Sequence, residues 1–345
     1  MVDEYGRKGF LERISDPYWF QALGNVLGYD WHSSGVTTVL TGVLKNAIDP
    51  GETGIAVCGG KGATSLKTPM EIRMLGEKFN IPEWRLEGLV RVSRLVAKVD
   101  NAVVQDGYSL YHHAMFITEE GYWAVVQQGL NPYSKTARRY HWLHSRTASF
   151  VEEPHYSVVS DRVEQAVLNL TAAESRGVRK ASVDLAVERP SKIARDFSAA
   201  VAMLSGNELL VDLEISREAL GRWRKAVKIP FLKMPRTLNW EAVKRLYDVQ
   251  PRNYEELIEV NGVGPATLRG LALISSLIYG EEASWRDPVK YSFAFGGKDG
   301  VPFPVNRKAM DEAISFLEES IRAAEIGYRE KIEALKRLRV FVDRG

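Results

Sequence analysis

The chain has 345 residues, of which 45% are hydrophobic and 26% charged, an ordinary composition for a globular protein of roughly two or three domains. A formal net charge of +2 excludes a protein that is strongly basic over its whole surface, so any surface that attracts nucleic acid must be local. The single cysteine, Cys58, excludes a framework of internal disulfides. Because the charged N-terminus lacks the apolar stretch of a signal peptide and no segment has the roughly 18 apolar residues of a membrane span, we expect a cytoplasmic protein with no membrane partner.

The first half of the chain predicts a mixture of helices and strands. Helices are indicated by apolar residues three and four positions apart, and strands by short β-branched or aromatic runs between turn residues. The predicted elements are, in chain order, a helical segment at 10–47, a strand that runs into a glycine-rich loop at 54–62, a helical segment at 68–98, strands at 114–118 and 122–128 joined by a hairpin at 119–121, and a basic helical segment at 133–142.

The second half predicts helices almost throughout. The pattern favours several helices within 160–228, helices near 239–248, 253–259 and 265–279, a loop rich in glycine and proline at about 280–306, and one long amphipathic helix at 307–341. We therefore expect an α+β protein, with a mixed α/β domain containing a small sheet at 1–155 and a helical domain at 156–345. The apolar stripe of the last helix fits either packing on the body of the protein or a homodimer interface.

The most specific motif is the turn between the helices near 253–259 and 265–279. Gly262 and Gly264 allow backbone conformations that are closed to residues with a Cβ atom, and Val263 between them can fill the junction of the helices. Pro265 suits a first helical position because its missing N–H would be unpaired there anyway. The free N–H groups that open the second helix, together with the helix dipole, then form a site for a phosphate oxygen.

The segment 257–271 resembles the helix-hairpin-helix family of DNA-binding motifs. Such motifs bind the nucleic-acid backbone without identifying bases. An ordinary corner between two helices with a glycine turn is the alternative. The residues expected to contact nucleic acid here are Asn261, Gly262, Val263, Gly264, Ala266, Thr267, whose hydroxyl would add a donor, and Arg269, whose charge would face the backbone.

The residues suited to catalysis lie in the first half, where all 6 histidines fall between positions 32 and 155. Carboxylates with imidazoles suit Mg²⁺ or Mn²⁺, and metal-dependent nucleases use such groups to activate water. Adjacent His112 and His113 would point to opposite faces of a strand, so we expect at most one of them in a given site. The candidate catalytic residues are Asp100, Asp106, His112, His113, Glu152 and His155, and the candidate metal ligands among them are Asp100, Asp106, Glu152 and His155.

Two further patterns suit contact with nucleic acid. Arginines interleaved with aromatics can pair with phosphates and stack on bases, and the candidates are Arg138, Arg139, Tyr140 and Trp142. The alternative is a helix with a solvated basic face. Glycine loops around Lys61 and Lys298 could hold a phosphate on exposed amides or be plain tight turns. Neither loop has the spacing of a nucleotide-binding P-loop, so we predict no nucleotide cofactor.

Several segments together resemble a wider family: DPYWFQALGNVLGYDWHSSG, GGKGATSLKTP, DNAVVQDGYSLYHH, WAVVQQGLN, ARRYHWL, FVEEPH and FAFGGKDG. They are similar to a domain-of-unknown-function family of archaea and thermophilic bacteria that carries a helix-hairpin-helix. The resemblance spans nearly the whole chain and implies no particular reaction.

The leading hypothesis is a DNA-binding protein of DNA processing or repair, a metal-dependent nuclease anchored by the helix-hairpin-helix, with RNA as the alternative partner. A protein that binds DNA or RNA without catalysis is the second hypothesis. A helix-hairpin-helix DNA glycosylase is the third, because members of that class carry a catalytic aspartate after the hairpin. Here Asp287 lies 23 positions after Gly264.

Overall fold

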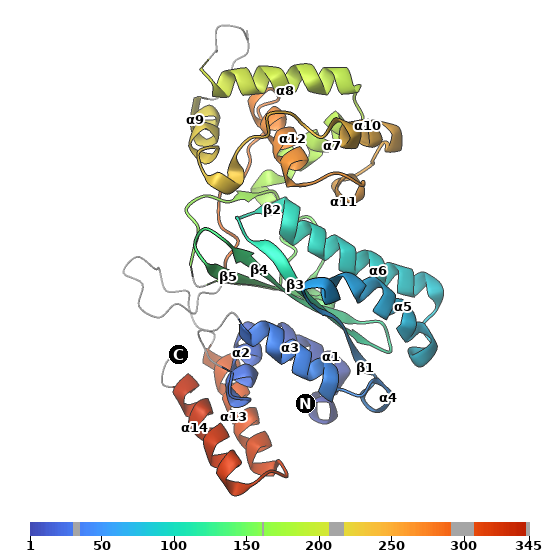
Figure 1. Ribbon diagram of the computed structural model, residues 1–345, viewed down its shortest axis with the longest axis vertical. Helices are drawn as coiled ribbons and strands as arrows, with labels where there is room; N and C mark the ends of the chain where they lie inside the picture. The colour runs from blue at the N-terminus through green and yellow to red at the C-terminus, as the bar shows by residue number, and fades with distance from the viewer. Residues whose placement is uncertain (30–34, 161, 207–216, 291–306, 343–345) are drawn as a thin grey trace.

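A computed structural model describes residues 1–29, 35–160, 162–206, 217–290 and 307–342 (Figure 1). The predicted α+β class is confirmed, since a small antiparallel sheet lies in the N-terminal half and helices dominate the C-terminal region. In Figure 1 the sheet occupies the middle of the molecule, a lobe of helices stands at one end, and the last two helices lie at the other end. Within the described residues, none of the helices is long and apolar enough to cross a membrane.

The central layer is a five-stranded antiparallel sheet with the strand order β1-β3-β4-β5-β6. Its strands are β1 (Ile55–Lys61), β3 (Ser109–Thr118), β4 (Trp123–Asn131), β5 (Thr136–Leu143) and β6 (Ser157–Ser160). The helices around it are α1 (Val2–Ser15), α2 (Pro17–Val26), α3 (Gly35–Ala47), the short α4 (Pro50–Thr53), α5 (Thr68–Phe79) and α6 (Glu83–Lys98). The strand β6 carries the sheet past residue 155.

Both faces of the sheet are buried, because helices cover each of them (Figure 1). Successive side chains of a strand point to opposite faces. In β4, Ala124 and Val126 pack with the residues of α1, α2 and α3, whereas Val125 belongs to the core that includes α5, α6 and the helical lobe. The strands therefore lack a polar outer face, and polar side chains within them, such as Gln127 and Arg138, are buried as well.

The helical lobe consists of α7 (Arg176–Ala186), α8 (Pro190–Leu204), α9 (Arg217–Ala226), α10 (Trp240–Val249), α11 (Tyr254–Glu259) and α12 (Pro265–Leu277). Every residue of α12 from Thr267 to Leu277 is buried, so this helix forms the centre of the lobe. A π-helical turn at Val99–Val103 follows α6 and leads into β2 (Val104–Gln105), which pairs with β7 (Leu168–Asn169) and joins the lobe to the sheet.

Three predicted helical segments need correction, because each of them contains more than one helix. The segment 10–47 contains separate helices, because Asp16 accepts hydrogen bonds from the N–H groups of Tyr18 (2.8 Å) and Trp19 (3.0 Å) and so starts α2. The segment 68–98 is two helices, divided at Asn80, whose φ of 50° is left-handed. The predicted single helix at 307–341 is α13 (Arg307–Ala323) and α14 (Tyr328–Val342).

The break between α13 and α14 lets both helices pack on the same partner. Their buried residues form one cluster with Trp19 and Ala22 of α2: Ala313, Leu317 and Ile321 from α13, and Ala334 and Leu338 from α14. One straight helix could not return to α2 in this way. The apolar stripe is thus at least partly covered within the chain.

The prediction of a basic helix at 133–142 is wrong, because residues 136–143 form the strand β5 between β4 and β6. Arg138 and Arg139 interrupt the apolar pattern that would indicate a buried strand. Their side chains are instead hydrogen-bonded to groups that are distant in the sequence. The local sequence pattern does not reveal these partners.

Candidate functional site

The first candidate site is the segment 260–266, called here the hairpin turn, which joins α11 to α12 and includes the first two residues of α12. Val263 is 1% exposed and fills the junction of the helices, as predicted. Gly262 has a φ of 89°, a conformation that favours glycine. Gly264 precedes Pro265, the first residue of α12, and Leu268 makes the first helical hydrogen bond to the Gly264 carbonyl at 3.0 Å.

The backbone carbonyl groups of the hairpin turn are hydrogen-bonded within the described residues, whereas two of its N–H groups are not. Its carbonyl oxygens accept hydrogen bonds from protein side chains: Asn261 from Arg245 (3.1 Å), Gly262 from Asn239 (3.3 Å), Val263 from Lys98, and Pro265 from Gln105 (2.9 Å). In contrast, the N–H groups of Gly264 and Ala266 donate to no group in the described part of the chain, and both residues are partly exposed. The turn therefore offers donors, and few acceptors, to a molecule outside.

Two residues expected at this surface lie inside the protein. Thr267 is 2% exposed and Arg269 is 8% exposed. The Arg269 guanidinium donates to the Gln105 side chain at 2.6 Å and to the Phe231 carbonyl at 3.3 Å, and burial lowers its pKa. The prediction that Arg269 directs its charge outward is wrong, because α12 is surrounded by the lobe and has no solvent face at this position.

The four residues predicted to contact nucleic acid from 138–142 are also buried, because they belong to β5 rather than to a surface helix. Arg138, Tyr140 and Trp142 are 0% exposed and Arg139 is 6% exposed. Arg139 donates to His141 at 2.8 Å and lies over the ring of Phe20. Their placement corrects the expectation of a basic and aromatic surface here.

Arg138 joins two carboxylates that are 32 and 149 residues away in the sequence. It donates to Asp106 at 2.8 Å and to Asp287 at 2.7 Å, and Tyr140 also donates to Asp106 at 2.7 Å. Burial lowers the pKa of Arg138, but the charges of the two aspartates outweigh burial and raise that pKa above its ordinary value. Asp106 is thus one member of a buried ionic network.

The candidate metal ligands are not brought together. Asp106 bonds to Arg138, and Glu152 pairs with Arg176 at 2.9 Å and also with Arg179. Asp100 and His155 do meet, with 2.5 Å between Asp100 Oδ1 and His155 Nε2. Among the residues that the structure describes, no group of three or more His, Cys, Asp or Glu side chains is placed to hold a metal ion.

His112 and His113 point to opposite faces of β3, as predicted. His112 Nε2 lies 2.9 Å from the Thr41 hydroxyl on the α3 side. His113 contacts Ser93 of α6 at 2.9 Å and Gln127 of β4 at 2.8 Å. Burial lowers the pKa of His112 to about 4, so its imidazole is neutral near pH 7.

Of the two lysines in glycine loops, Lys61 is exposed at the end of β1, and Lys298 lies outside the described residues. The glycines before Lys61 have a structural reason. Gly59 has a φ of 94°, and a Cβ atom there would lie 2.2 Å from the His113 carbonyl oxygen. Close packing of β1 on β3 therefore accounts for Gly59 without a ligand.

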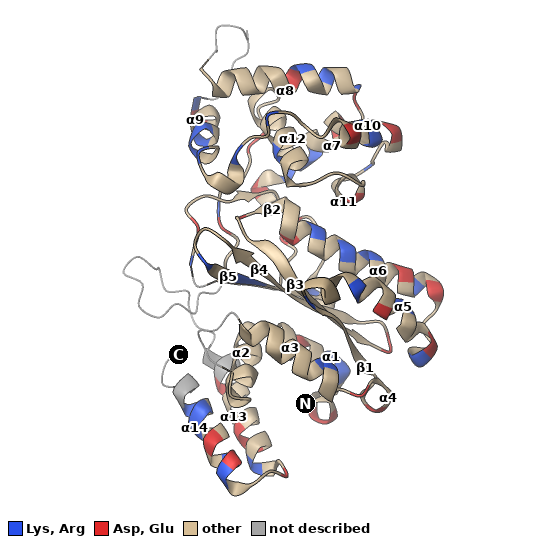
Figure 2. Ribbon diagram, viewed as in Figure 1, with Lys and Arg blue, Asp and Glu red and all other residues tan. Residues whose placement is uncertain are grey.

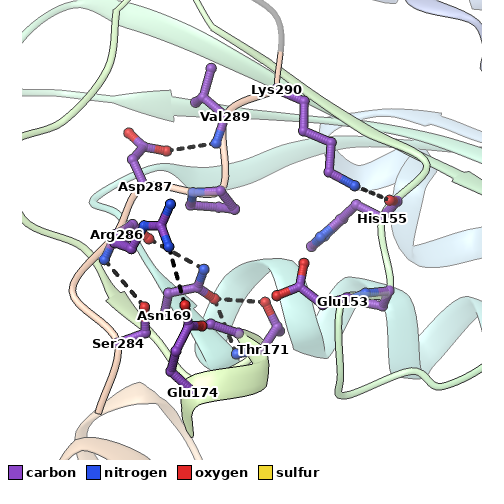
Figure 3. A pocket seen from close by; sticks show the side chains of 13 residues that line it. Glu153, His155, Asn169, Thr171, Glu174, Ser284, Arg286, Asp287, Val289 and Lys290 are labelled. Carbon is purple, nitrogen blue, oxygen red and sulfur yellow. Dashed lines mark hydrogen bonds and ion pairs between the residues drawn. The ribbon is translucent and has the colours of Figure 1, made fainter.

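The second candidate site is a polar cavity of about 270 Å³ between the sheet and the helical lobe (Figure 3). Three segments form its wall, two of them neighbours in the sequence at 153–155 and 169–174 and one distant from both at 284–290. The sequence pattern indicated His155 and Asp287 in this wall, but not most of the polar and charged residues beside them. Those residues include Asn169, Thr171, Arg286 and Lys290. The local signals for this region were the motif FVEEPH, which contains His155, and the position of Asp287 after the hairpin.

The Asp287 carboxylate at this cavity is fully engaged. Its Oδ2 accepts hydrogen bonds from Arg138 (2.7 Å) and from the Glu164 N–H (2.6 Å), and its Oδ1 accepts the Val289 N–H (3.0 Å). These bonds fix the loop at 287–289 and explain the Asp-Pro turn.

The basic residues gather locally, in agreement with the small net charge. Figure 2 shows Lys and Arg along α9, and a mixture of acidic and basic residues along α5 and α6. In α6, Arg91 pairs with Glu259 of α11 at 2.7 Å, so part of this charge holds the sheet layer to the lobe rather than facing solvent freely.

Comparison with known proteins supports membership of a domain-of-unknown-function family, as the sequence motifs indicated. A family described as "Protein of unknown function (DUF763)" matches residues 1–305. Neither the curated proteins nor the solved structures contain a match to this chain. With most of its length matched, the chain belongs to the DUF763 family of proteins of unknown function.

Proposed function

We propose that this protein binds DNA through its phosphate backbone and is anchored by the hairpin turn, which acts as a helix-hairpin-helix element. The observation that supports this proposal is the unequal use of polar groups at the turn. The carbonyls of Gly262 and Val263 are bonded to protein side chains, whereas the N–H groups of Gly264 and Ala266 are unbonded among the described residues and partly exposed. Unpaired N–H groups at a helix N-terminus suit an anionic oxygen.

The rigidity of the turn supports the same proposal. Val263 is buried, and Lys98 and Gln105 fix the carbonyls on either side of Gly264. Donors that are already held in place lose little conformational entropy on binding. Because contacts to the backbone do not distinguish bases, we expect binding that depends on salt more than on sequence, as in a protein of DNA processing or repair. A cytoplasmic location fits this partner.

The catalytic hypotheses gain less support. A metal-dependent nuclease of the predicted kind needs Asp106 and Glu152 near an ion, but their carboxylates pair with arginines. A glycosylase would need a free carboxylate at Asp287, and both of its oxygens accept hydrogen bonds. The anchoring function is therefore the one that the geometry supports best.

The test compares two charge-matched variants, Gly264→Asp and Gly88→Asp. A Cβ atom at either position meets nothing within 4 Å, and neither glycine has a positive φ, so both chains should fold. Gly264→Asp places a carboxylate where the phosphate oxygen would lie. Gly88 lies in α6, ten residues and roughly 15 Å before its last residue, Lys98. Affinity for labelled DNA is measured by fluorescence anisotropy at several salt concentrations.

We expect Gly264→Asp to weaken binding about tenfold or more. A charge-assisted hydrogen bond is worth roughly 1.5–3 kcal/mol, and about 1.4 kcal/mol corresponds to tenfold in affinity. Gly88→Asp should leave affinity nearly unchanged. Equal losses in the two variants would mean general charge repulsion, and the hairpin turn would not be the anchor. A wild-type protein with no affinity for DNA or RNA would refute the proposal outright.

A further inference from the structure

His155 lines the polar cavity, and behind it lies the buried carboxylate of Asp100. Asp100 is 0% exposed, and its Oδ1 lies 2.5 Å from His155 Nε2. Its Oδ2 accepts hydrogen bonds from Gln127 (2.5 Å) and Trp142 (2.9 Å). The carboxylate is therefore fixed by donors from two strands of the sheet and from the loop that precedes β6.

The imidazole of His155 is held by this carboxylate and lines the cavity. Its ring also packs against Trp142, with 4.6 Å between ring centroids. The second nitrogen, Nδ1, has no hydrogen-bond partner among the described residues, and it is not enclosed by protein. A carboxylate that accepts the proton of one imidazole nitrogen fixes the tautomer and leaves the other nitrogen with a lone pair, the arrangement of a general base.

The backbone around this pair is unusual at two points. Asp100 lies in the π-helical turn Val99–Val103, and π-helical turns are rare and occur often at functional sites. Glu153, which lines the same cavity, has a φ of 44°, a left-handed conformation that residues other than glycine rarely adopt. Such conformations persist where the surroundings enforce them, and they gather at active sites.

The cavity wall has two cations that can contact a phosphate ester, Lys290 and Arg286, beside the carboxylates of Glu153, Glu174 and Asp287. Lys290 lies at its wall, where its ammonium donates to the His155 carbonyl at 3.1 Å (Figure 3). Arg286 lines the same cavity and pairs with Glu174 at 3.2 Å. A volume of about 270 Å³ is near the lower limit of pockets for small molecules, so it fits a single sugar-phosphate unit rather than a duplex.

One short segment connects the cavity to the hairpin turn. Lys98 donates to the Val263 carbonyl and Gln105 donates to the Pro265 carbonyl, and Asp100 lies between these two residues. Two residues span at most about 8 Å between Cα atoms, so the hairpin turn and the cavity are on the order of 20 Å apart once side chains are included. A few nucleotides of a strand cover that distance.

We propose that the cavity is a hydrolytic site in which His155 acts as a general base on a phosphodiester of single-stranded DNA. Asp100 is the positioning residue, and the choice of a DNA strand rests on the proposed anchoring function. His155 Nδ1 takes a proton from a water molecule, and the water oxygen forms a bond to phosphorus. The bond from phosphorus to one bridging oxygen breaks, that oxygen takes a proton from solvent water, and the imidazole returns its proton to solvent. Lys290 attracts the phosphate.

The experiment uses the full chain, fluorescently labelled single-stranded DNA, and EDTA throughout, with products separated by length. We expect cleavage without added metal. His155→Ala should lower the rate about 100-fold or more, the usual contribution of a general base. Added imidazole should restore part of that loss, which a merely structural role would not explain. Asp100→Asn should lower kcat with KM unchanged. His144→Ala is the matched control, because this exposed histidine lies outside the cavity, and its rate should match the wild type.

Two arms separate this proposal from the anchoring function. A small activated diester, bis(p-nitrophenyl) phosphate, needs no hairpin turn, so its hydrolysis should depend on His155 and not on Gly264. If Gly264→Asp leaves DNA affinity unchanged while His155 remains essential for this diester, only the anchor fails. If DNA binds but neither substrate is cleaved in EDTA, the hydrolytic site is wrong. Cleavage that requires Mg²⁺ or Mn²⁺ and ignores His155→Ala, or cleavage of RNA alone, would also overturn it.

Discussion

Replacing Arg138 by methionine tests the most deeply buried charge in the sheet. Methionine keeps much of the length and apolar character of the side chain but removes the guanidinium that contacts Asp106 and Asp287. Tyr140 would still donate to Asp106 at 2.7 Å, but no cation would remain beside either carboxylate. The substitution therefore isolates the electrostatic part of the network.

The magnitude follows from the protonation of Asp106. Burial raises the pKa of Asp106, and the charge of Arg138 is the largest influence that opposes burial. Without Arg138, the folded protein has its lowest free energy when the Asp106 carboxyl is protonated. From its ordinary pKa of 3.8, each pH unit costs about 1.4 kcal/mol, or about 4 kcal/mol at pH 7. Breaking a buried ion pair typically costs about 3–5 kcal/mol, in agreement with this value.

The sign of the pH dependence can be derived in the same way. Above pH 3.8, the unfolded variant has lost the proton that the folded variant keeps on Asp106, so stability falls as pH rises. The loss relative to wild type should shrink to about 2 kcal/mol at pH 5. Urea unfolding followed by tryptophan fluorescence at both pH values measures it.

The matched control is Arg162→Met, which removes an exposed arginine that pairs with Glu164 at 3.1 Å. It should cost no more than about 1 kcal/mol. The double variant Arg138→Met with Asp106→Asn should remove most of the difference between pH 5 and pH 7. A loss for Arg138→Met that equals the control, or one that grows as pH falls, would refute the reasoning. If Arg138→Met strongly lowers the affinity for DNA but leaves stability unchanged, Arg138 contacts nucleic acid directly, as the sequence pattern predicted.

Two further outcomes follow from burial and backbone geometry. Gly42→Ala should stabilise the protein by about 0.5–1 kcal/mol in thermal or urea unfolding, because Gly42 is exposed within α3 and a Cβ atom there meets nothing within 4 Å; a loss of stability would contradict this. Burial, and after it the charge of Glu71, raises the pKa of Cys58 from 9.0 to about 12. At pH 8 the folded protein should therefore carry roughly a thousandfold less thiolate than the unfolded chain and react correspondingly slowly with a thiol reagent, whereas similar rates would show that the thiol is accessible.

The features that the sequence predicted correctly are those determined by residues close to one another along the chain. The hairpin turn depends on Gly262, on Val263 and on Pro265, all within one short segment. The opposite directions of His112 and His113 follow from the alternation of a strand and needed no tertiary information. Turn residues likewise placed the hairpin between β3 and β4.

The incorrect predictions concern side chains whose partners are distant in the sequence. Arg138 indicates a surface helix when only its neighbours are considered, yet Asp106 and Asp287 make its burial in a strand tolerable. The prediction for Arg269 is wrong for a related reason. The helix α12 is buried on every side from Thr267 onward, so the spacing of its apolar residues cannot identify an outer face. The candidate catalytic residues were chosen by type alone, so the sequence identified Asp100 and His155 without revealing that these two meet and that Glu152 lies elsewhere.

The segment from Lys98 to Gln105 explains why the hairpin turn and the cavity are best understood together. Its ends hold the carbonyls on either side of Gly264, and its middle presents Asp100 to His155. A continuous α-helix through this segment would not contain the π-helical turn that is observed here. The π-helical turn replaces regular α-helical hydrogen bonds with less favourable ones, so its presence needs an explanation in packing or in function. Here the turn holds the Asp100 carboxylate against the imidazole of His155. The same segment contacts the hairpin turn, whose N–H groups suit a phosphate, and this gives a functional reason for the π-helical turn.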